Sequence, residues 1–140
     1  AINSVGTSYG NEVSFTTEAT STLNIGDTHQ GGIVFYLDGS GGGLIAAPSD
    51  QSTGAAQWDV AVSLCNNLTL GGYTDWYLPS KDELNSLYLQ RDVVGGFANS
   101  RYWSSTENGT NYAWLQGFVY GSQNFLPKSY NFLVRAVRAF

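Results

Sequence analysis

Few residues in this sequence are of the types that perform catalysis. The chain of 140 residues holds one histidine, His29, and one cysteine, Cys65. His29 stands just before a Gly-Gly pair, and no H-E-x-x-H motif or second cysteine accompanies either residue. Cys65 falls on the apolar face of a predicted helix, which indicates a buried and unreactive thiol. We therefore expect no catalytic residues and no enzyme activity.

The acidic residues do not form a metal-binding motif. Asp38, Asp50, Asp59 and Asp75 are isolated and lack the alternating spacing of a calcium loop. The run DGSGGG that starts at Asp38 is not followed by Lys-Ser/Thr or by a helix, so it predicts a hairpin turn rather than a phosphate loop. We expect no metal ion and no cofactor. The alternative that stays open is one structural ion held partly by backbone carbonyls.

The segment from 108 to 133 has the composition of a binding surface. Seven aromatic residues alternate there with Asn, Gly and Ser, and Lys128 is its only charged residue. Tyrosine gives rigid contact area at low entropic cost, and small polar side chains give adaptable hydrogen bonds. The alternative is that the aromatic residues are ordinary core, which we favour for Trp114 and Phe118. Display at the surface is expected for Tyr112, Tyr120, Phe125, Tyr130 and Phe132.

Composition excludes several classes of protein. Aromatic residues make up 14% of the chain and charged residues only 12%, unlike a disordered chain. The net charge of -5 and the six Lys and Arg residues argue against a nucleic-acid partner, which would need clustered cations. No apolar run approaches the roughly 20 residues of a membrane span.

The elements that must position these residues follow from local patterns. Residues 31–37 and 44–48 predict two strands of a β-hairpin, and residues 59–68 have the spacing of a short helix. Ser80 and Glu83 form a capping box that begins a second helix, which the Gly95-Gly96 pair ends. The rest is predicted to be β-rich and to close with a strand over Val134 to Phe140. Because strands and helices are segregated, the fold class is α+β.

The first residues are predicted to lie outside this domain. Residues 1–17 resemble the last hairpin of a fibronectin type III domain, which implies such a domain upstream in the same chain. Residues 18–24 are rich in Thr and Ser and predict a linker. Residues 25–140 form the predicted ligand-binding domain.

Several motifs together resemble one bacterial family. They are IGDTHQGGIVFYLD from Ile25, GLIAAPSDQS from Gly43, GGYTDWYLPSKDELNSLY from Gly71, YWSSTE from Tyr102, Ala113-Trp114 and the closing VRAVRAF. In this order they resemble the domain at the C-terminus of a Legionella collagen-like adhesin. The resemblance implies a C-type-lectin-like fold and a place outside the cell or on its surface, as part of a larger bacterial protein. Arg135 and Arg138 are expected to be scaffold, paired with acids such as Glu107 or Asp75, and the alternative is a role in binding anionic sugars.

A subset of this family is similar to the variable proteins of diversity-generating retroelements, in which template adenines are rewritten so that NNY codons result. The resemblance implies scaffold residues at Trp114, Gln116, Phe118, Gly121, Gln123, Lys128 and the closing strand. The positions between them are the expected variable ligand-binding residues: Asn108, Gly109, Thr110, Asn111, Tyr112, Leu115, Gly117, Val119, Tyr120, Ser122, Asn124, Phe125, Leu126, Pro127, Ser129, Tyr130, Asn131 and Phe132. NNY codons cannot encode Glu, Lys, Gln, Met or Trp, and none of these positions holds one.

The sequence thus predicts a binding module whose partner is an unknown protein or glycan at a cell or phage surface. An adhesin without diversification, which binds a fixed polysaccharide or sulfated glycan, is the alternative. Such a site needs several cations together, and the tail offers only Lys128, Arg135 and Arg138. A structural capping domain would have a surface poor in aromatic residues, which the tail's composition disfavours.

Overall fold

A computed structural model describes residues 22–51 and 54–140 of the chain. The fold is mixed, with two antiparallel sheets and few helices, which agrees with the predicted α+β class. The predicted fibronectin-like segment (residues 1–17) and most of the predicted linker (18–24) lie outside the described residues. No described helix is long and apolar enough to cross a bilayer.

The first sheet contains four strands in the order β1-β2-β3-β7. Its strands are β1 (Thr28–His29), β2 (Gly32–Leu37), β3 (Gly43–Ala46) and β7 (Val137–Ala139). The predicted hairpin is confirmed, because β2 pairs antiparallel with β3. The C-terminal strand is shorter than predicted, since only its last part pairs with β3.

The second sheet is built from the C-terminal half of the chain. It orders β4 (Arg101–Glu107), β5 (Tyr112–Gly117) and β6 (Gln123–Pro127). In the antiparallel register Arg101 faces Gly117, and Leu115 faces Trp103 on one side and Asn124 on the other. Because side chains alternate along a strand, one face carries Arg101, Leu115 and Gly117, and the other carries Trp114 and Gln116.

Three helices connect and flank the sheets: α1 (Trp58–Asn66), α2 (Lys81–Leu89) and α3 (Arg91–Val94). The sequence predicted two helices, and the second, predicted to run from Ser80 to the Gly95-Gly96 pair, is divided at Gln90 into α2 and α3. The predicted capping box is present, since the Ser80 hydroxyl accepts from the Glu83 N–H and the Glu83 carboxylate accepts from the Ser80 N–H. Leu84 and Leu87 are the buried residues of α2.

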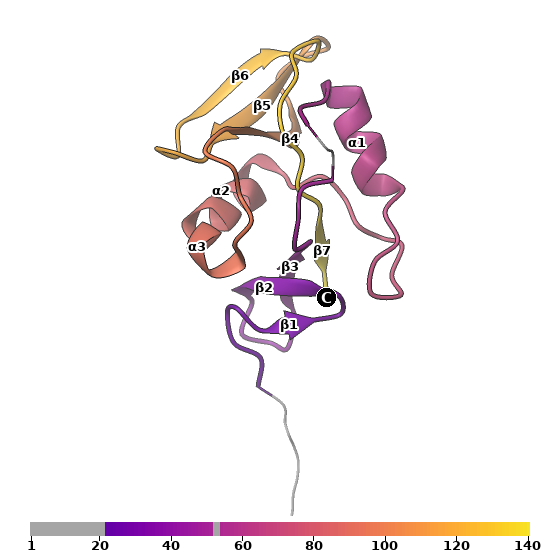
Figure 1. Cartoon of the computed structure of the whole chain (residues 1–140), viewed down its shortest axis with the longest axis vertical. Coiled ribbons are helices and arrows are strands. Elements are labelled where there is room, and N and C mark those ends of the chain that lie inside the picture. The colour runs from indigo at the N-terminus through magenta and orange to yellow at the C-terminus, as the bar shows by residue number, and fades with distance from the viewer. Residues whose placement is uncertain (1–21, 52–53) are drawn as a thin grey trace, which may run out of the picture.

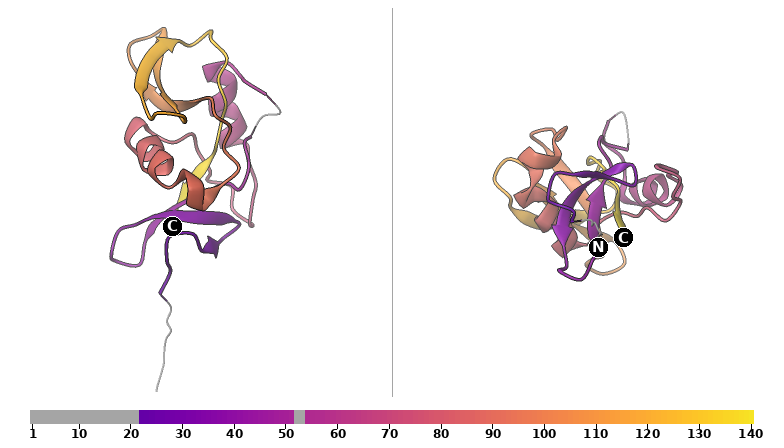
Figure 2. Two further views of the ribbon diagram at one scale, coloured as in Figure 1. Left: turned by 60° about the vertical axis from the view of Figure 1, so that its left-hand side comes forward. Right: turned by 90° about the horizontal axis from the view of Figure 1, so that it is seen from below.

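The two sheets lie at opposite ends of the molecule (Figures 1 and 2). The four-stranded sheet holds the start of the described chain and the C-terminus, while the three-stranded sheet lies at the far end. The buried core runs between them and contains Trp76, Trp103, Val134 and Ala136. The tail that was predicted to bind therefore lies at the end of the molecule opposite the start of the described chain.

Candidate functional site

The predicted scaffold positions hold the three-stranded sheet against α2. Gln116 is fully buried, and its side-chain amide donates to Asn85 Oδ1 (2.9 Å) and to the Gly121 carbonyl (3.1 Å). The Gln123 amide donates to the Lys81 carbonyl at the start of α2 (2.9 Å). None of the six interleaved scaffold positions is exposed: Trp114, Gln116, Phe118, Gly121, Gln123 and Lys128. Long-range hydrogen bonds and burial thus fix these residues in place.

The predicted binding positions are mostly exposed. Of the eighteen, thirteen are exposed and three are half-buried. Among the large hydrophobic side chains that the structure describes, Tyr120 is the most open, with 88% of its surface exposed, and Tyr130 is 49% exposed. The display predicted for Tyr112, Tyr120, Phe125 and Tyr130 is therefore confirmed.

Phe132 contradicts the prediction of surface display, and Leu115, another predicted binding position, is also buried. Leu115 is 2% exposed and Phe132 is 9% exposed. Phe132 packs edge-to-face on Trp103, with 4.9 Å between ring centroids, and its backbone pairs with that of Ala56. The surrounding strands bury both side chains, which the sequence pattern alone did not reveal.

A groove of about 600 Å³ opens on the face of the sheet that carries Leu115 and Gly117. Eight of its lining residues are predicted binding positions: Leu115, Gly117, Val119, Tyr120, Ser122, Asn124, Asn131 and Phe132. The two buried residues, Leu115 and Phe132, thus contribute to the bottom of the groove rather than to the outer surface. Amides, hydroxyls and an exposed tyrosine ring surround them.

Sequence reasoning missed one wall of this groove. Asn99, Ser100 and Arg101 also line it. Arg101 is exposed, and its guanidinium carbon lies 5.9 Å from the centroid of the Phe132 ring. The only local signal was a polar Asn-Ser-Arg run directly before a strand, which does not by itself distinguish a binding wall from a solvated loop.

The opposite face of the sheet carries an aromatic patch. Phe125 contacts both Trp114 and Tyr112 edge-to-face, with centroid distances of 5.1 and 6.1 Å. The Lys81 ammonium lies 3.7 Å from the centroid of the Trp114 ring. Tyr112 and Phe125 are predicted binding positions, so these positions occupy both faces of the sheet.

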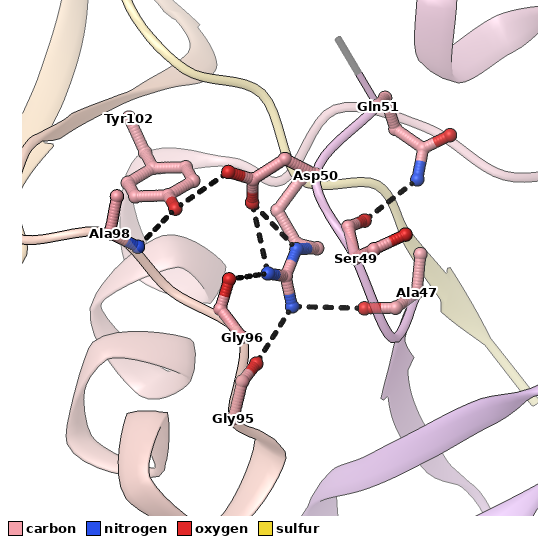
Figure 3. Close-up of polar contacts among 9 residues, drawn as sticks. Ala47, Ser49, Asp50, Gln51, Gly95, Gly96, Ala98 and Tyr102 are labelled. Atoms are coloured by element: carbon pink, nitrogen blue, oxygen red, sulfur yellow. Dashed lines mark hydrogen bonds and ion pairs between the residues drawn. The ribbon is translucent and has the colours of Figure 1, made fainter. Parts of the chain in front are cut away.

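A buried ionic network holds the segment that leads into the missed wall (Figure 3). Arg135 is fully buried, and its guanidinium pairs with the Asp50 carboxylate at 2.9 Å. The same guanidinium donates to three main-chain carbonyls, those of Ala47 (3.1 Å), Gly95 (3.2 Å) and Gly96 (2.8 Å). Arg135 thereby connects the loop after α3 to Ala47, the residue that follows β3.

Tyr102 extends this network toward the groove. Its hydroxyl donates to Asp50 Oδ2 (3.0 Å) and accepts from the Ala98 N–H (3.0 Å). Burial raises the pKa of Tyr102 to about 12, so the hydroxyl keeps its proton and remains a donor at neutral pH. Hydrogen bonds to Gly95, Gly96 and Ala98 therefore hold the part of the loop that leads to Asn99.

The predicted ion pairs are correct in part. Arg138 pairs with Asp75, as expected, and this contact lowers the pKa of the Asp75 carboxyl. Arg135 takes Asp50 instead, and Glu107 pairs with Lys128. The Lys128 ammonium also donates to the Thr110 carbonyl (2.8 Å), which secures the loop between β4 and β5.

The residues considered for catalysis do not meet in one place. Cys65 is buried, and burial raises the pKa of its thiol to about 12. The His29 ring packs edge-to-face on Phe140, at 4.7 Å between centroids. One G-x-S-x-G string, from Gly6 to Gly10, lies outside the described residues. Among the described residues, no group of three or more His, Cys, Asp or Glu side chains could hold a metal ion.

Comparison with known proteins identifies the family. The family model described as the Lcl C-terminal domain matches residues 28–138, which is most of the chain. The chain belongs to the Lcl C-terminal domain family. The predicted resemblance to the adhesin's C-terminal domain is thereby confirmed. Among the curated proteins, none matches this Lcl C-terminal domain.

Proposed function

We propose that this Lcl C-terminal domain is a ligand-binding module of a bacterial surface or secreted protein, and that its tail is a variable recognition surface. Membership of the family indicates a surface adhesin-like module. The finer proposal is that a retroelement diversifies the tail on a C-type-lectin-like scaffold. Its partner is a protein or glycan at a cell or phage surface.

One observation carries the proposal: exposure and burial alternate along the tail in step with the two predicted sets of positions. None of the six interleaved scaffold positions is exposed, whereas thirteen of the eighteen binding positions are exposed, three are half-buried and two are buried. A surface that must accept many sequences needs this separation, because exchange of exposed side chains leaves the core intact.

The placement of the tail supports display. The three-stranded sheet lies at the end of the molecule opposite the start of the described chain and the C-terminus (Figure 1). Exposed clustered aromatic residues mark interaction sites, and Tyr112 and Phe125 form such a contact on one face of the sheet while Tyr120 lines the groove on the other. Binding rather than catalysis is the activity we propose.

A fixed sulfated-glycan adhesin finds less support in the geometry. Of the tail's three cations, Lys128 is paired with Glu107, Arg138 is paired with Asp75 and Arg135 is fully buried. A polyanion would therefore have to compete with existing ion pairs for two of them, and the third is inaccessible.

The test of diversification is to sequence the 3′ end of the gene across its source population. We expect variation concentrated at the binding positions, and a near-copy of the tail with AAY codons beside a reverse-transcriptase reading frame. A tail that is uniform between isolates, with no template copy, would overturn diversification and favour the fixed adhesin.

A second experiment tests whether the scaffold tolerates such exchange. NNY codons are introduced one position at a time, and folding is scored by resistance of the displayed protein to protease. Substitutions at Tyr120, Asn124 and Tyr130 should leave resistance unchanged, while Gln116 and Phe118, as matched neighbours, should not tolerate them. Loss of folding at the three exposed positions would show that they are structural.

A further inference from the structure

The groove on the three-stranded sheet is bordered by a cation that has no ion-pair or hydrogen-bond partner among the described residues. Within residues 22–51 and 54–140, the cations in ion pairs are Lys128, Arg135 and Arg138. The Arg101 guanidinium has neither an ion pair nor a hydrogen bond in that part of the chain. No acidic residue lines the groove that it borders. The groove is therefore locally positive although the whole chain carries a net charge of -5.

The other polar side chains of the groove are also available to a ligand. Those of Asn99, Ser100, Ser122, Asn124 and Asn131 line it and make no hydrogen bond to the described protein. Amides and hydroxyls can both donate and accept, whereas a guanidinium only donates. A ligand that satisfies the whole set must therefore present an acceptor to Arg101 among mixed polar groups, and a carboxylate also complements its unpaired charge.

Gly117 leaves the space that makes Arg101 reachable from the groove. It stands directly opposite Arg101 in the β4–β5 register. A Cβ built on Gly117 meets nothing closer than the Ser122 carbonyl, at 3.9 Å, and the backbone there is not in the left-handed region. A larger residue fits at 117 without backbone strain, and its side chain would stand beside Arg101 on the same face of the sheet.

Exposed apolar side chains surround this polar site. Val119 is 44% exposed and Tyr120 is 88% exposed, and both line the groove. A charged anchor with aromatic and aliphatic contacts beside it is an arrangement found in protein–protein hot spots, in which Arg and Tyr are enriched. A volume of about 600 Å³ has room for one or two inserted side chains.

We propose that the groove receives an acidic side chain of a protein partner, whose carboxylate pairs with Arg101, and that residue 117 sets which side chains can enter. This inference rests on the proposed function and names its partner chemistry. Arg101 is not one of the variable positions, so it stays the same from one variant to the next. The variable residues around it would determine which acidic partner binds. A guanidinium binds a carboxylate through two parallel hydrogen bonds, which also fixes its orientation.

The experiment is to select short random peptides on the folded chain by phage display. Peptides whose binding is lost in Tyr120→Ala are taken as tail binders, and their affinities are measured by calorimetry. We expect each to contain an essential Asp or Glu. Replacing that residue with Asn or Gln, or making Arg101→Gln in the protein, should weaken binding about tenfold to a hundredfold, and the two changes together should cost little more than either alone.

Two variants serve as matched controls. Lys81→Gln removes a cation from the opposite face of the same sheet and should leave the affinity unchanged. Gly117→Trp fills the groove and should abolish binding, while the melting temperature stays that of the parent protein. Arg101→Gln should also keep the parent melting temperature, because the side chain is exposed and makes no polar contact.

The outcomes separate this inference from the proposed function. Tail-binding peptides without an acidic requirement, or with equal affinity for Arg101→Gln, overturn the carboxylate pairing and leave the binding function standing. If no tail-binding peptide is selected at all, the inference is also overturned. Competition with free glucuronate and free N-acetylglutamate distinguishes the source of the carboxylate, and stronger displacement by the sugar acid would overturn the choice of a protein partner.

Discussion

The buried Asp50–Arg135 pair gives the sharpest test of how the groove wall is held. Asp50→Asn keeps the shape of the side chain but leaves the Arg135 guanidinium charged and fully buried without a counter-ion. Breaking a buried pair in this way costs about 3–5 kcal/mol of the free energy of unfolding. The Asp50 side chain is 19% exposed, so water reaches one side of the pair. We therefore expect the lower end of this range, about 3 kcal/mol.

A loss of this size is a large fraction of a domain's stability, which is typically about 5–15 kcal/mol. Urea unfolding measures it, and with an m value of about 1.5 kcal/mol/M the midpoint should fall by about 2 M. Amide hydrogen exchange should also accelerate from Gly95 to Ala98, since Arg135 and Tyr102 anchor that loop through Asp50.

Asp75→Asn is the matched control, because it removes the same charge from the other Arg–Asp pair. The Asp75 side chain is 65% exposed, and exposed ion pairs contribute little to stability. Its urea midpoint should stay close to that of the parent protein. If the two variants unfold at the same urea concentration, the reasoning that the buried pair holds the groove wall is wrong.

Two further predictions concern single residues. Gly121 has a φ of +82°, and a Cβ there would lie 2.6 Å from the Tyr88 ring. Gly121→Ala should therefore lower the free energy of unfolding by about 1–3 kcal/mol, whereas Gly117→Ala should change it by less than about 0.5 kcal/mol. Equal urea midpoints for the two variants would refute this distinction. Burial raises the pKa of the Cys65 thiol to about 12, so at pH 8 it is protonated and inaccessible, and iodoacetamide should label it only after unfolding. Mass spectrometry measures the labelling. Labelling of the native protein at the rate of a free thiol would contradict the prediction that Cys65 is inaccessible.

Local sequence patterns were sufficient to predict the elements that are fixed by hydrogen bonds between residues close together in the chain. The capping box at Ser80 and Glu83 predicts the start of α2, because both hydrogen bonds form between residues three apart. The turn at Asp38 follows in the same way, since the Asp38 carboxylate accepts from the Ser40 and Gly42 N–H groups. The family motifs were also local strings and could be matched without a structure.

The candidate site itself was only half visible in the sequence. Composition indicated a binding tail, and the interleaved pattern separated most exposed positions from buried ones. Leu115 and Phe132 differ from their exposed neighbours only through what packs on them, such as Trp103 on Phe132. Burial of a single residue in a sheet depends on which face its neighbours cover, and those neighbours come from distant parts of the chain.

The sequence by itself therefore determined the family, the hairpin, the main helices and the character of the tail, since each rests on short-range periodicity or composition. Tertiary structure alone decided the groove, because β-sheet register brings Arg101 opposite Gly117. It also decided that Arg135 pairs with Asp50, which lies 85 positions earlier in the chain. Electrostatic pairing depends on distance in space, and in a sheet of distant strands that distance is not encoded in local spacing.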